Sequence, residues 1–302
     1  MKKSLVVMAA GMGSRFGGLK QIEPVGPNNE VILDYSVFDA KRCGFDRVVF
    51  VITHEIEKVF KEKVGKRLEK YIDVKYAFQN LEDIPSNKQY LVEKREKPWG
   101  TVQALLCAKE FVEGSFVVIN ADDFYGYNSF KKASNFLDSV KNVTVNACIT
   151  YPYINVSSVH GPVKRGVCYM DSRDNIVDIV ECKIKTREEF AECSSLENDY
   201  VFNIGLAHPV SMNMFAFKHK FFDYLEEYFD LFFERSDEEL ETAEALLPTV
   251  VKDKIATKEI ILKNIESNGL WMGLTYRNDL EGMKERIMDL IHDGEYPNEL
   301  WK

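Results

Sequence analysis

The sequence predicts an α/β fold whose sheet is mixed, mostly parallel and flanked by helices. Short apolar runs alternate with amphipathic stretches through residues 5–120, which is the strand-and-helix order of parallel sheets with right-handed crossovers. Beyond residue 150 the pattern changes to alternating strands around a polar turn, which indicates an antiparallel hairpin. The 302 residues suit one large domain, or one domain with a C-terminal extension.

The elements of the first half follow from apolar runs of strand length and from periodic stretches that end at helix-stop signals. They are a strand over 5–8, a helix over 33–42 closed by Gly44, a strand over 47–52, a helix over 55–64, a strand over 74–78, a helix over 101–112 with Thr101 as its N-cap, and a strand over 115–120. Because ligands of such sheets bind at the carboxyl ends of the strands, Gly11, Gln79 and Asp122 are expected near the site.

The second half is predicted to be less regular. We expect a strand over 143–149, a hairpin of 166–171 and 176–181 across the turn 172–175, a Phe-rich helix within 215–233, an acidic stretch over 236–244, and an amphipathic helix over 279–292. No internal repeat or low-complexity linker interrupts these elements.

The loop after the first strand has the composition of a phosphate site. Gly11 and Gly13 lack a Cβ, so backbone N–H groups there can approach an anion closely, and Arg15 and Lys20 add positive charge. The loop therefore predicts a nucleoside triphosphate or pyrophosphate ligand.

Two common glycine loops do not fit this segment. The dinucleotide-binding fingerprint needs a glycine at the sixth position from Gly11, where Phe16 stands. The Walker loop, counted from Gly13, needs a lysine after Gly18, where Leu19 stands. A basic start followed by an apolar stretch imitates a secretion signal, but the run over 5–10 is too short for one.

The remaining pattern, A-A-G-M-G-S-R followed by K-Q-I-E-P, resembles the signature of the sugar-phosphate nucleotidylyltransferases. The resemblance implies a three-layer, Rossmann-like nucleotidyltransferase fold that joins a sugar 1-phosphate to a nucleoside triphosphate with Mg²⁺ as cofactor. It implies a catalytic domain over 1–245, with a nucleotide half to about 126 and a sugar half after it, and a C-terminal extension over 246–302 packed on the same domain.

The resemblance assigns roles to individual residues of the nucleotide half. Arg15 and Lys20 would hold the triphosphate, and Asp122, after a small residue at a strand end, would hold the metal while Asp123 faces away. The expected nucleotide contacts are Ala10, Gly11, Gly13, Gln79, Gly100 and Thr101. Read alone, Asp122 and Asp123 are an ordinary strand exit capped by solvated acids, and the segment at Gly100 is an ordinary turn with Trp99 in the core.

The part of the chain after residue 126 departs from the family pattern in two places, and the first is in the sugar half. Gly166 fits the family's hairpin glycine, but the element Glu181-Cys182-Lys183 has its lysine displaced by one residue and no proline. The resemblance gives Glu181 and Asn213 to the sugar and Lys183 to its phosphate; residues 203–205 compete with the segment at Asn213. Solvated hairpin charge explains these residues about as well.

The second departure concerns the metal. Relatives with two metal ligands carry an aspartate two residues after a tryptophan, and here Trp271 is followed at that spacing by Gly273. Asp279 lies too far along, and Asn278 with Glu281 forms a capping-box pattern, so we interpret Asp279 as structural.

The composition limits the partners. A net charge of −9 argues against nucleic acid and anionic membrane as partners, and no stretch approaches the roughly 20 apolar residues of a membrane helix. The six cysteines have no metal-ligand spacing with the five histidines, so we expect reduced thiols in a cytoplasmic protein. The Phe-rich segment would supply a homo-oligomer interface if its aromatic rings exceed what the core buries.

Three alternatives stay open. A cytidylyltransferase for a non-sugar phosphate such as phosphocholine would share the first half of the chain. A catalytically silent nucleotide-sugar sensor would explain Gly273 without any chemistry. A nicotinamide oxidoreductase with Asp34 as the ribose acid is disfavoured by Phe16. The nucleobase and the sugar are not encoded in any motif that we recognise.

Overall fold

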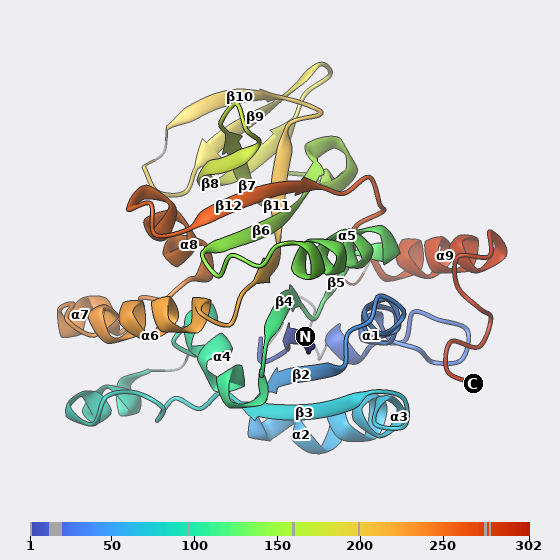
Figure 1. The fold of residues 1–302 in the computed structure, drawn as a ribbon, viewed down its shortest axis with the longest axis horizontal. Helices are drawn as coiled ribbons and strands as arrows, with labels where there is room; N and C mark the ends of the chain where they lie inside the picture. Colours follow the sequence, from blue (N-terminus) through green and yellow to red (C-terminus); the bar gives the residue numbers. More distant parts are fainter. Residues whose placement is uncertain are drawn as a thin grey trace.

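A computed structural model describes residues 2–11, 20–95, 97–158, 161–198, 200–274, 277 and 279–302. It shows a mixed α/β fold in which one large sheet is flanked by helices (Figure 1). The strands lie in the order β10-β9-β8-β12-β6-β11-β4-β1-β2-β3, with β7 paired to β11 and β8. Among the described residues, no helix combines the length and the apolar character that crossing a membrane requires.

The amino-terminal half is the parallel part of this sheet. It contains β1 (Lys3–Met8), β2 (Arg47–Ile52), β3 (Asp73–Phe78) and β4 (Ser115–Asn120), and every neighbouring pair among them is parallel. The connections pass through α1 (Ile32–Arg42), α2 (His54–Phe60) with the turns that follow it to α3 (Lys66–Leu68), and α4 (Thr101–Ala108). The predicted elements of this half are confirmed to within a few residues. Parallel strands need such crossovers, so their carboxyl ends share one edge.

The sheet is mixed, and the prediction that it is mostly parallel is wrong because the second half is largely antiparallel. The antiparallel hairpin predicted over 166–171 and 176–181 is confirmed. The strands of the second half are β6 (Val145–Pro152), β7 (Val163–Met170), β8 (Asn175–Thr186), β9 (Phe190–Ser195), β10 (Val201–Gly205), β11 (Pro209–Phe217) and β12 (Ile261–Glu266). Apart from β12 with β6, all their pairings are antiparallel, including β11 with β4. The short loops between β7, β8, β9 and β10 cause this, because a tight turn can join only antiparallel strands.

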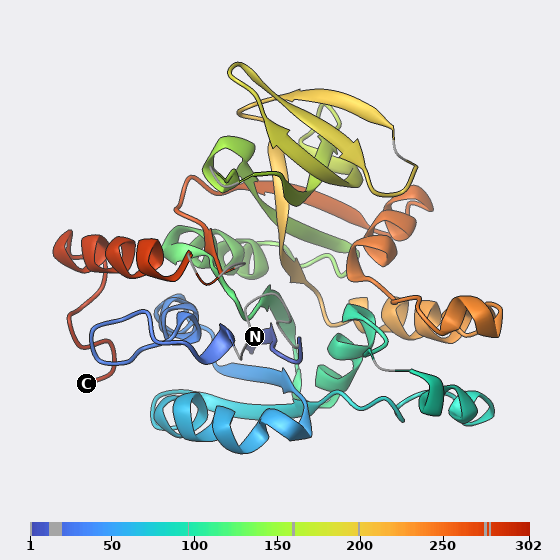
Figure 2. The same ribbon diagram turned by 180° about the vertical axis from the view of Figure 1, so that it is seen from behind.

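Helices pack on both faces of the sheet (Figure 2). α1, α2 and α5 (Gly126–Ser139) cover one face, while α4, α6 (Phe221–Phe232) and α8 (Leu247–Ala256) cover the other. The expected Phe-rich helix begins later than predicted, since Phe215 and Phe217 belong to β11. Most aromatic rings of α6 are buried within the chain, and Tyr228 is partly buried. The oligomeric state stays a prediction.

The last residues of the chain join the two halves. β12 lies between β6 and β8, and the short β13 (Met272–Gly273) pairs with β5 (Asp123–Phe124) just beyond β4. α9 (Asp279–His292) and the tail pack in a small core of their own with Tyr35 and Phe124. β13 and Leu274 thus lie beside the end of β4, where the Leu274 N–H donates to the Asp122 carbonyl at 3.1 Å. The domain boundary at residue 245 stays a prediction.

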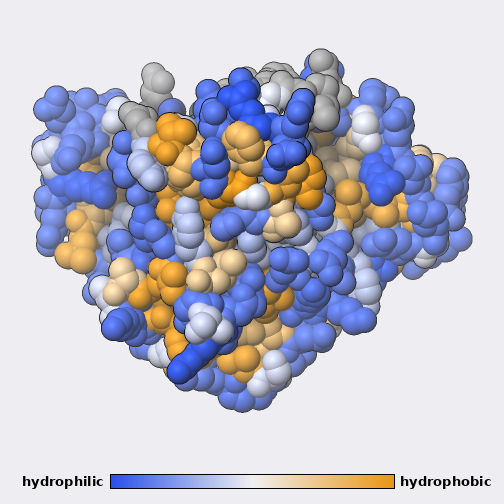
Figure 3. All heavy atoms as spheres, turned by 90° about the horizontal axis from the view of Figure 1, so that it is seen from above, coloured by the Kyte–Doolittle hydropathy of each residue, from blue (hydrophilic) through white to orange (hydrophobic). Residues whose placement is uncertain are grey.

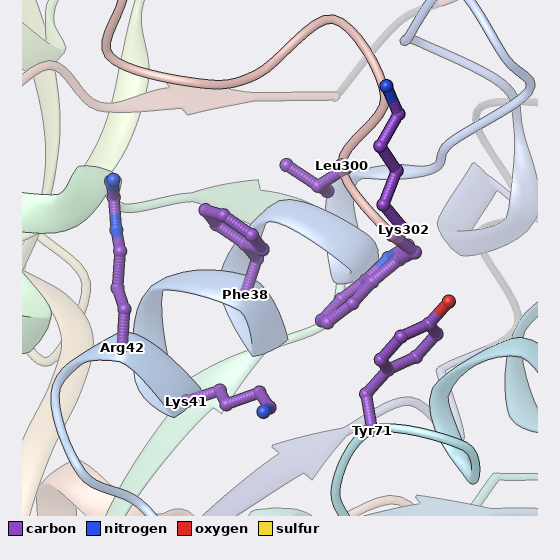
Figure 4. Close-up of a pocket in the computed structure, with 7 residues that line it drawn as sticks. Phe38, Lys41, Arg42, Tyr71, Leu300 and Lys302 are labelled. Carbon is purple, nitrogen blue, oxygen red and sulfur yellow. The ribbon is translucent and has the colours of Figure 1, made fainter.

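A cavity of about 300 Å³ lies between α1 and the C-terminal tail. Phe38, Tyr71 and Leu300 line it, and Lys41, Arg42 and Lys302 add positive charge around it (Figure 4). The Trp301 indole closes it from inside and donates from Nε1 to Asp34 at 3.0 Å. The cavity thus marks how the tail docks on α1.

Seen from the β9–β10 end, the surface is mostly hydrophilic, with apolar residues gathered in smaller groups between charged ones (Figure 3). The exposed large apolar side chains of β8, β9, β10 and their connections are Val177, Phe190, Leu196, Tyr200 and Val201. These small groups contrast with the continuous cores on the two sheet faces.

Candidate active site

The predicted phosphate loop starts at the shared edge of the parallel strands. Ala10 and Gly11 follow β1, and Asp122 follows the neighbouring β4, whose exit is tied to β1 by the bond from Ala121 N to the Met8 carbonyl at 3.2 Å. Ala10 is buried and Gly11 is exposed, with open space where a Cβ would lie. Gly13 and Arg15 lie outside the described residues, so their roles stay predictions.

Lys20 reaches Asp122 from the far end of this loop. Lys20 begins a 3₁₀ turn, Lys20–Ile22, which the neighbouring Gln21 holds against β1 by donating from Nε2 to the Ala9 carbonyl at 3.2 Å. The Lys20 ammonium forms an ion pair with the Asp122 carboxylate and lies 3.3 Å from the Leu274 carbonyl. Both side chains keep about a quarter of their surface exposed. A cation at Asp122 is therefore compatible with the site.

Asp123 has a different environment from Asp122. It is 7 % exposed, and its Oδ2 lies 3.0 Å from Asn120 Nδ2 and 3.2 Å from the Tyr125 hydroxyl, both of which can donate to it. Burial, and after it the negative charge of Asp122, raises the pKa of Asp123 to about 7. Asp122 is therefore partly exposed and Asp123 is held inside. Which of the two binds a metal stays a prediction.

Gly273 lies directly beside Asp123. The two residues pair between β13 and β5, and a Cβ at Gly273 would lie 2.9 Å from Asp123 Oδ1 and 2.7 Å from the Trp271 ring. In relatives with two metal ligands, this sequence position carries the second carboxylate. Here the position lies next to Asp122 and Asp123, and the neighbouring atoms leave no space for a side chain. α9 begins at Asp279 as predicted, while Asn278 lies outside the described residues, so the capping box stays a prediction.

The predicted base-binding residues come together at the start of α4. The Gln79 amide donates from Nε2 to the Gly100 carbonyl at 3.0 Å and to Gln103 Oε1 at 3.0 Å. Gln103, which sequence reasoning missed, also donates to the Asn80 carbonyl at 2.6 Å. Gln103 lies one turn into a helix that starts at a glycine, and this position is the sequence signal that could have identified it. Trp99 is fully buried, so its interpretation as a core residue is confirmed.

Thr101 is not the N-cap of α4, contrary to the prediction. Gly100 takes that position with φ +104°, and Thr101 is the first helical residue. The Thr101 hydroxyl instead accepts from the Leu247 N–H at 2.8 Å, while the Ala245 carbonyl accepts from the Val102 N–H at 3.0 Å. The segment with Ala245 and Leu247, which is distant in sequence, thus forms the hydrogen bonds at the start of α4. No local sequence pattern predicts these bonds.

Replacing Gly100 with alanine should destabilise this turn. The positive φ alone costs a residue with a Cβ roughly 1–3 kcal/mol, and the new Cβ would lie 2.4 Å from the Ala245 carbonyl oxygen. We expect the free energy of unfolding, measured with urea, to fall by at least that amount. Gly205→Ala is the matched control, because a Cβ there meets nothing within 4 Å. Equal stability of the two variants would contradict the prediction.

The predicted sugar residues Gly166 and Glu181 face each other across β7 and β8. A Cβ at Gly166 would lie 2.9 Å from Glu181 Oε1 and 3.3 Å from Ser211 Cβ, so only glycine fits there. Burial raises the pKa of Glu181, and the charge of Glu197 adds to this. The geometry provides a partly buried carboxyl group beside a buried glycine whose Cβ position is crowded.

Asn213 sits on an irregular stretch of β11. Its φ is +60°, which asparagine tolerates better than most residues, and the β11–β6 register shifts between Ser211 and Met214. The irregularity brings the Met212 carbonyl within 2.8 Å of the Tyr125 hydroxyl, two residues from Asp123. Lys183 is exposed on β8. The roles of Asn213 and Lys183 stay predictions.

A metal centre built from side chains alone is not present in the described part of the chain. No group of three or more His, Cys, Asp or Glu residues converges there. One or two carboxylates completed by substrate phosphates and water is, however, the usual arrangement for Mg²⁺. The donor set at Asp122 fits that arrangement.

Comparisons with known proteins show which proteins this chain is similar to. The chain is 24 % identical over 183 residues to the low-salt glycan biosynthesis nucleotidyltransferase Agl11 of Haloferax volcanii, covering 58 % of this chain and 43 % of the relative. It is 26 % identical over 237 residues to the bifunctional protein GlmU of Methanococcus aeolicus, covering 76 % and 46 %. The chain thus spans about half the length of these curated relatives or less.

Two solved structures share the fold over almost the whole chain. The inositol-1-phosphate CTP transferase of T. maritima has a TM-score of 0.62 at 15 % identity, covering 95 % of this chain and 97 % of its own. A putative glucose-1-phosphate thymidylyltransferase of Bacillus anthracis gives the same score and identity, covering 95 % and 96 %. The sequence model of the nucleotidyl transferase family matches residues 4–272. With its glycine loop, its Lys20–Asp122 pair and this match over most of its length, the chain belongs to the nucleotidyl transferase family.

Proposed function

We propose that the protein joins a sugar 1-phosphate to a nucleoside triphosphate and releases pyrophosphate. The observation that carries the proposal is the Lys20–Asp122 pair at the ends of β1 and β4, directly after the glycine loop. Helices on both sheet faces support the finer proposal of a three-layer, Rossmann-like architecture, and the charge and composition support a cytoplasmic location.

The reaction needs no nucleophile from the protein. An oxygen of the sugar phosphate attacks the α-phosphorus in line, a new P–O bond forms, and the bond to the β-phosphate breaks as pyrophosphate leaves. Lys20, placed at Asp122, would neutralise charge on the triphosphate and on the leaving pyrophosphate. Asp122 would hold Mg²⁺, which supplies charge stabilisation at the phosphates when bound.

Two separate parts of the site support the binding of the nucleoside triphosphate and of the sugar 1-phosphate. The Gln79 nitrogen is engaged by Gly100 and Gln103, so a base contact would use the amide oxygen of Gln79 to accept from a donor on the base. At the hairpin of β7 and β8, the partly buried Glu181 carboxyl supports binding of sugar hydroxyl groups, which can donate to it.

A second candidate is a cytidylyltransferase that acts on a phosphate other than a sugar phosphate. A solved structure titled as an inositol-1-phosphate CTP transferase shares the fold over 95 % of this chain, which keeps the candidate open. Inositol resembles a sugar in carrying a ring of hydroxyl groups, so the Glu181 end would serve it as well.

The test is a panel of the common nucleoside triphosphates against hexose 1-phosphates, inositol 1-phosphate and phosphocholine, with pyrophosphate release as the readout. We expect one nucleotide with a hexose 1-phosphate to give release that EDTA abolishes. Preference for CTP with a non-sugar phosphate would support the second candidate. Stabilisation by a nucleoside-diphosphate sugar without any pyrophosphate release would instead indicate a silent binding protein.

A further inference from the structure

Arg165 on β7 is a largely buried cation that forms no ion pair among the described residues. Its Nε and Nη2 donate to the Val156 carbonyl at 3.1 and 2.7 Å, and its Nη1 donates to the Lys164 carbonyl at 2.8 Å. A guanidinium has five N–H donors, so these bonds leave part of its capacity unused. A charge removed from water without an opposite charge is costly, which points to an anion that binds there.

The positive charge of Arg165 interacts electrostatically with Asp123 and with Glu181. Burial lowers the pKa of Arg165, while the carboxylates of Asp123 and, more weakly, Glu181 act in the opposite direction. Neither carboxylate is within ion-pair distance in the described part of the chain. The guanidinium therefore lies within electrostatic reach of both the aspartate pair and the predicted sugar-binding glutamate.

Trp271 gives a second, independent observation at the same place. The Arg165 guanidinium lies over the Trp271 ring, 4.7 Å from its centroid. The indole Nε1–H is buried and finds no hydrogen-bond acceptor among the residues that the structure describes. Among the described residues, the Arg165 guanidinium has no counter-charge and the Trp271 indole N–H has no acceptor. Because the two groups are in contact, a ligand rich in acceptor oxygens would satisfy both.

The strand register explains why the cation comes from β7. Arg165 pairs directly with Cys182, so the two side chains lie on the same face of the sheet. Cys182 follows Glu181 directly, at the position where the family pattern described above has a lysine. Lys183, one residue later, alternates to the opposite face and is exposed. Arg165 is thus the cation on the face where the lysine is missing.

We propose that Arg165, supported by Trp271 Nε1, binds the phosphate group of the sugar 1-phosphate. The proposal rests on the proposed function. That phosphate links the sugar to the atom under attack, so it must lie between the sugar-binding end at Glu181 and the metal end at Asp122 and Asp123. Arg165 lies over the Trp271 ring, which contacts the Cβ position of Gly273 beside Asp123, and its strand neighbour Gly166 pairs with Glu181. The triphosphate is instead served by Lys20 at the strand edge.

The first test measures binding of inorganic phosphate by calorimetry and needs no turnover. It uses a Lys20→Ala background, in which the triphosphate end is weakened, with and without Arg165→Gln. We expect Arg165→Gln to raise the phosphate Kd by roughly 10- to 100-fold, the effect of losing hydrogen bonds to a charged group. Arg173→Gln, on the exposed turn between β7 and β8, is the matched control and should leave the Kd unchanged.

An unchanged phosphate Kd in Arg165→Gln, with or without a lower unfolding midpoint, would show a structural role and overturn the proposal. If Arg165→Gln does not fold, Arg165→Lys replaces it, because lysine keeps the charge and loses the planar fork. We expect its Kd to rise about tenfold, and an unchanged value would overturn the proposal as well.

The second test uses turnover and separates this proposal from the proposed function. Where the panel above identifies an active pair, Arg165→Gln should raise the KM for the sugar phosphate by at least about tenfold and leave the KM for the triphosphate within about twofold. A rise in the triphosphate KM alone would overturn the assignment. Failure of the whole panel would refute the proposed function, while the phosphate-binding result would still decide the anion site.

Discussion

Replacing Asp122 with asparagine should lower Mg²⁺-dependent turnover by about 10³-fold, since a bound metal contributes several kcal/mol of charge stabilisation at the phosphates. Asparagine keeps the size of the side chain but loses the charge that holds the cation. The ion pair with Lys20 shows that the carboxylate accepts a cation in its present geometry. Pyrophosphate release over a Mg²⁺ titration is the measurement.

Asp123→Asn is the matched control for this variant. Asp123 is buried and bonded to Asn120 and Tyr125, and asparagine can still accept those bonds through its amide oxygen. We therefore expect a milder loss of turnover, within about tenfold, and a similar Mg²⁺ requirement. If Asp123→Asn were the more damaging change, the assignment of the metal ligand to Asp122 would be wrong.

Replacing Lys20 with alanine should lower turnover by roughly 10²-fold or more, as the loss of a charge-stabilising donor typically does. The ammonium is placed at the strand edge by the turn Lys20–Ile22, so the effect should come from the missing charge and not from unfolding. Steady-state kinetics with the active pair of substrates measures it, and calorimetric or thermal unfolding confirms that the variant is folded.

Lys284→Ala provides the comparison, because Lys284 is a lysine of α9 that pairs with Glu281 on the exposed surface. Such surface pairs contribute little to stability, so both turnover and the unfolding midpoint should stay near wild type. Wild-type turnover in Lys20→Ala would remove the loop from the mechanism. The same expectation for Arg15→Ala rests on the sequence pattern alone.

The nucleotide half of the chain was predictable because its signals are local. Apolar runs such as Arg47–Ile52 and Ser115–Asn120 are long enough to mark buried strands, and parallel topology brings their carboxyl ends to one edge. The placement of Lys20 against Asp122 is consistent with the pattern read from the sequence. Where these signals end, at the loops of the second half, the predictions became less accurate.

The errors share a physical cause, which is competition from distant parts of the chain. Thr101 has the side chain of an N-cap, but Leu247 takes its hydroxyl, and Gly100 must adopt a positive φ against Ala245. The aromatic run at Phe215 is compatible with a helix or a strand. It forms a strand because it pairs with β4 and β6. A local pattern cannot include a partner that lies far away along the chain.

The sequence by itself determined the α/β class and the strands whose carboxyl ends share one edge, because these depend on periodicity over a few residues. The phosphate-binding role of the loop and the metal-binding role of Asp122 stay predictions. Only the tertiary structure decided which groups share the site. The β7–β8 register pairs Arg165 with Cys182, β13 brings Gly273 and Trp271 against Asp123, and burial leaves the Arg165 guanidinium without a carboxylate partner in the described part of the chain. Register and burial arise from packing between distant segments, so they become visible only when the chain is folded.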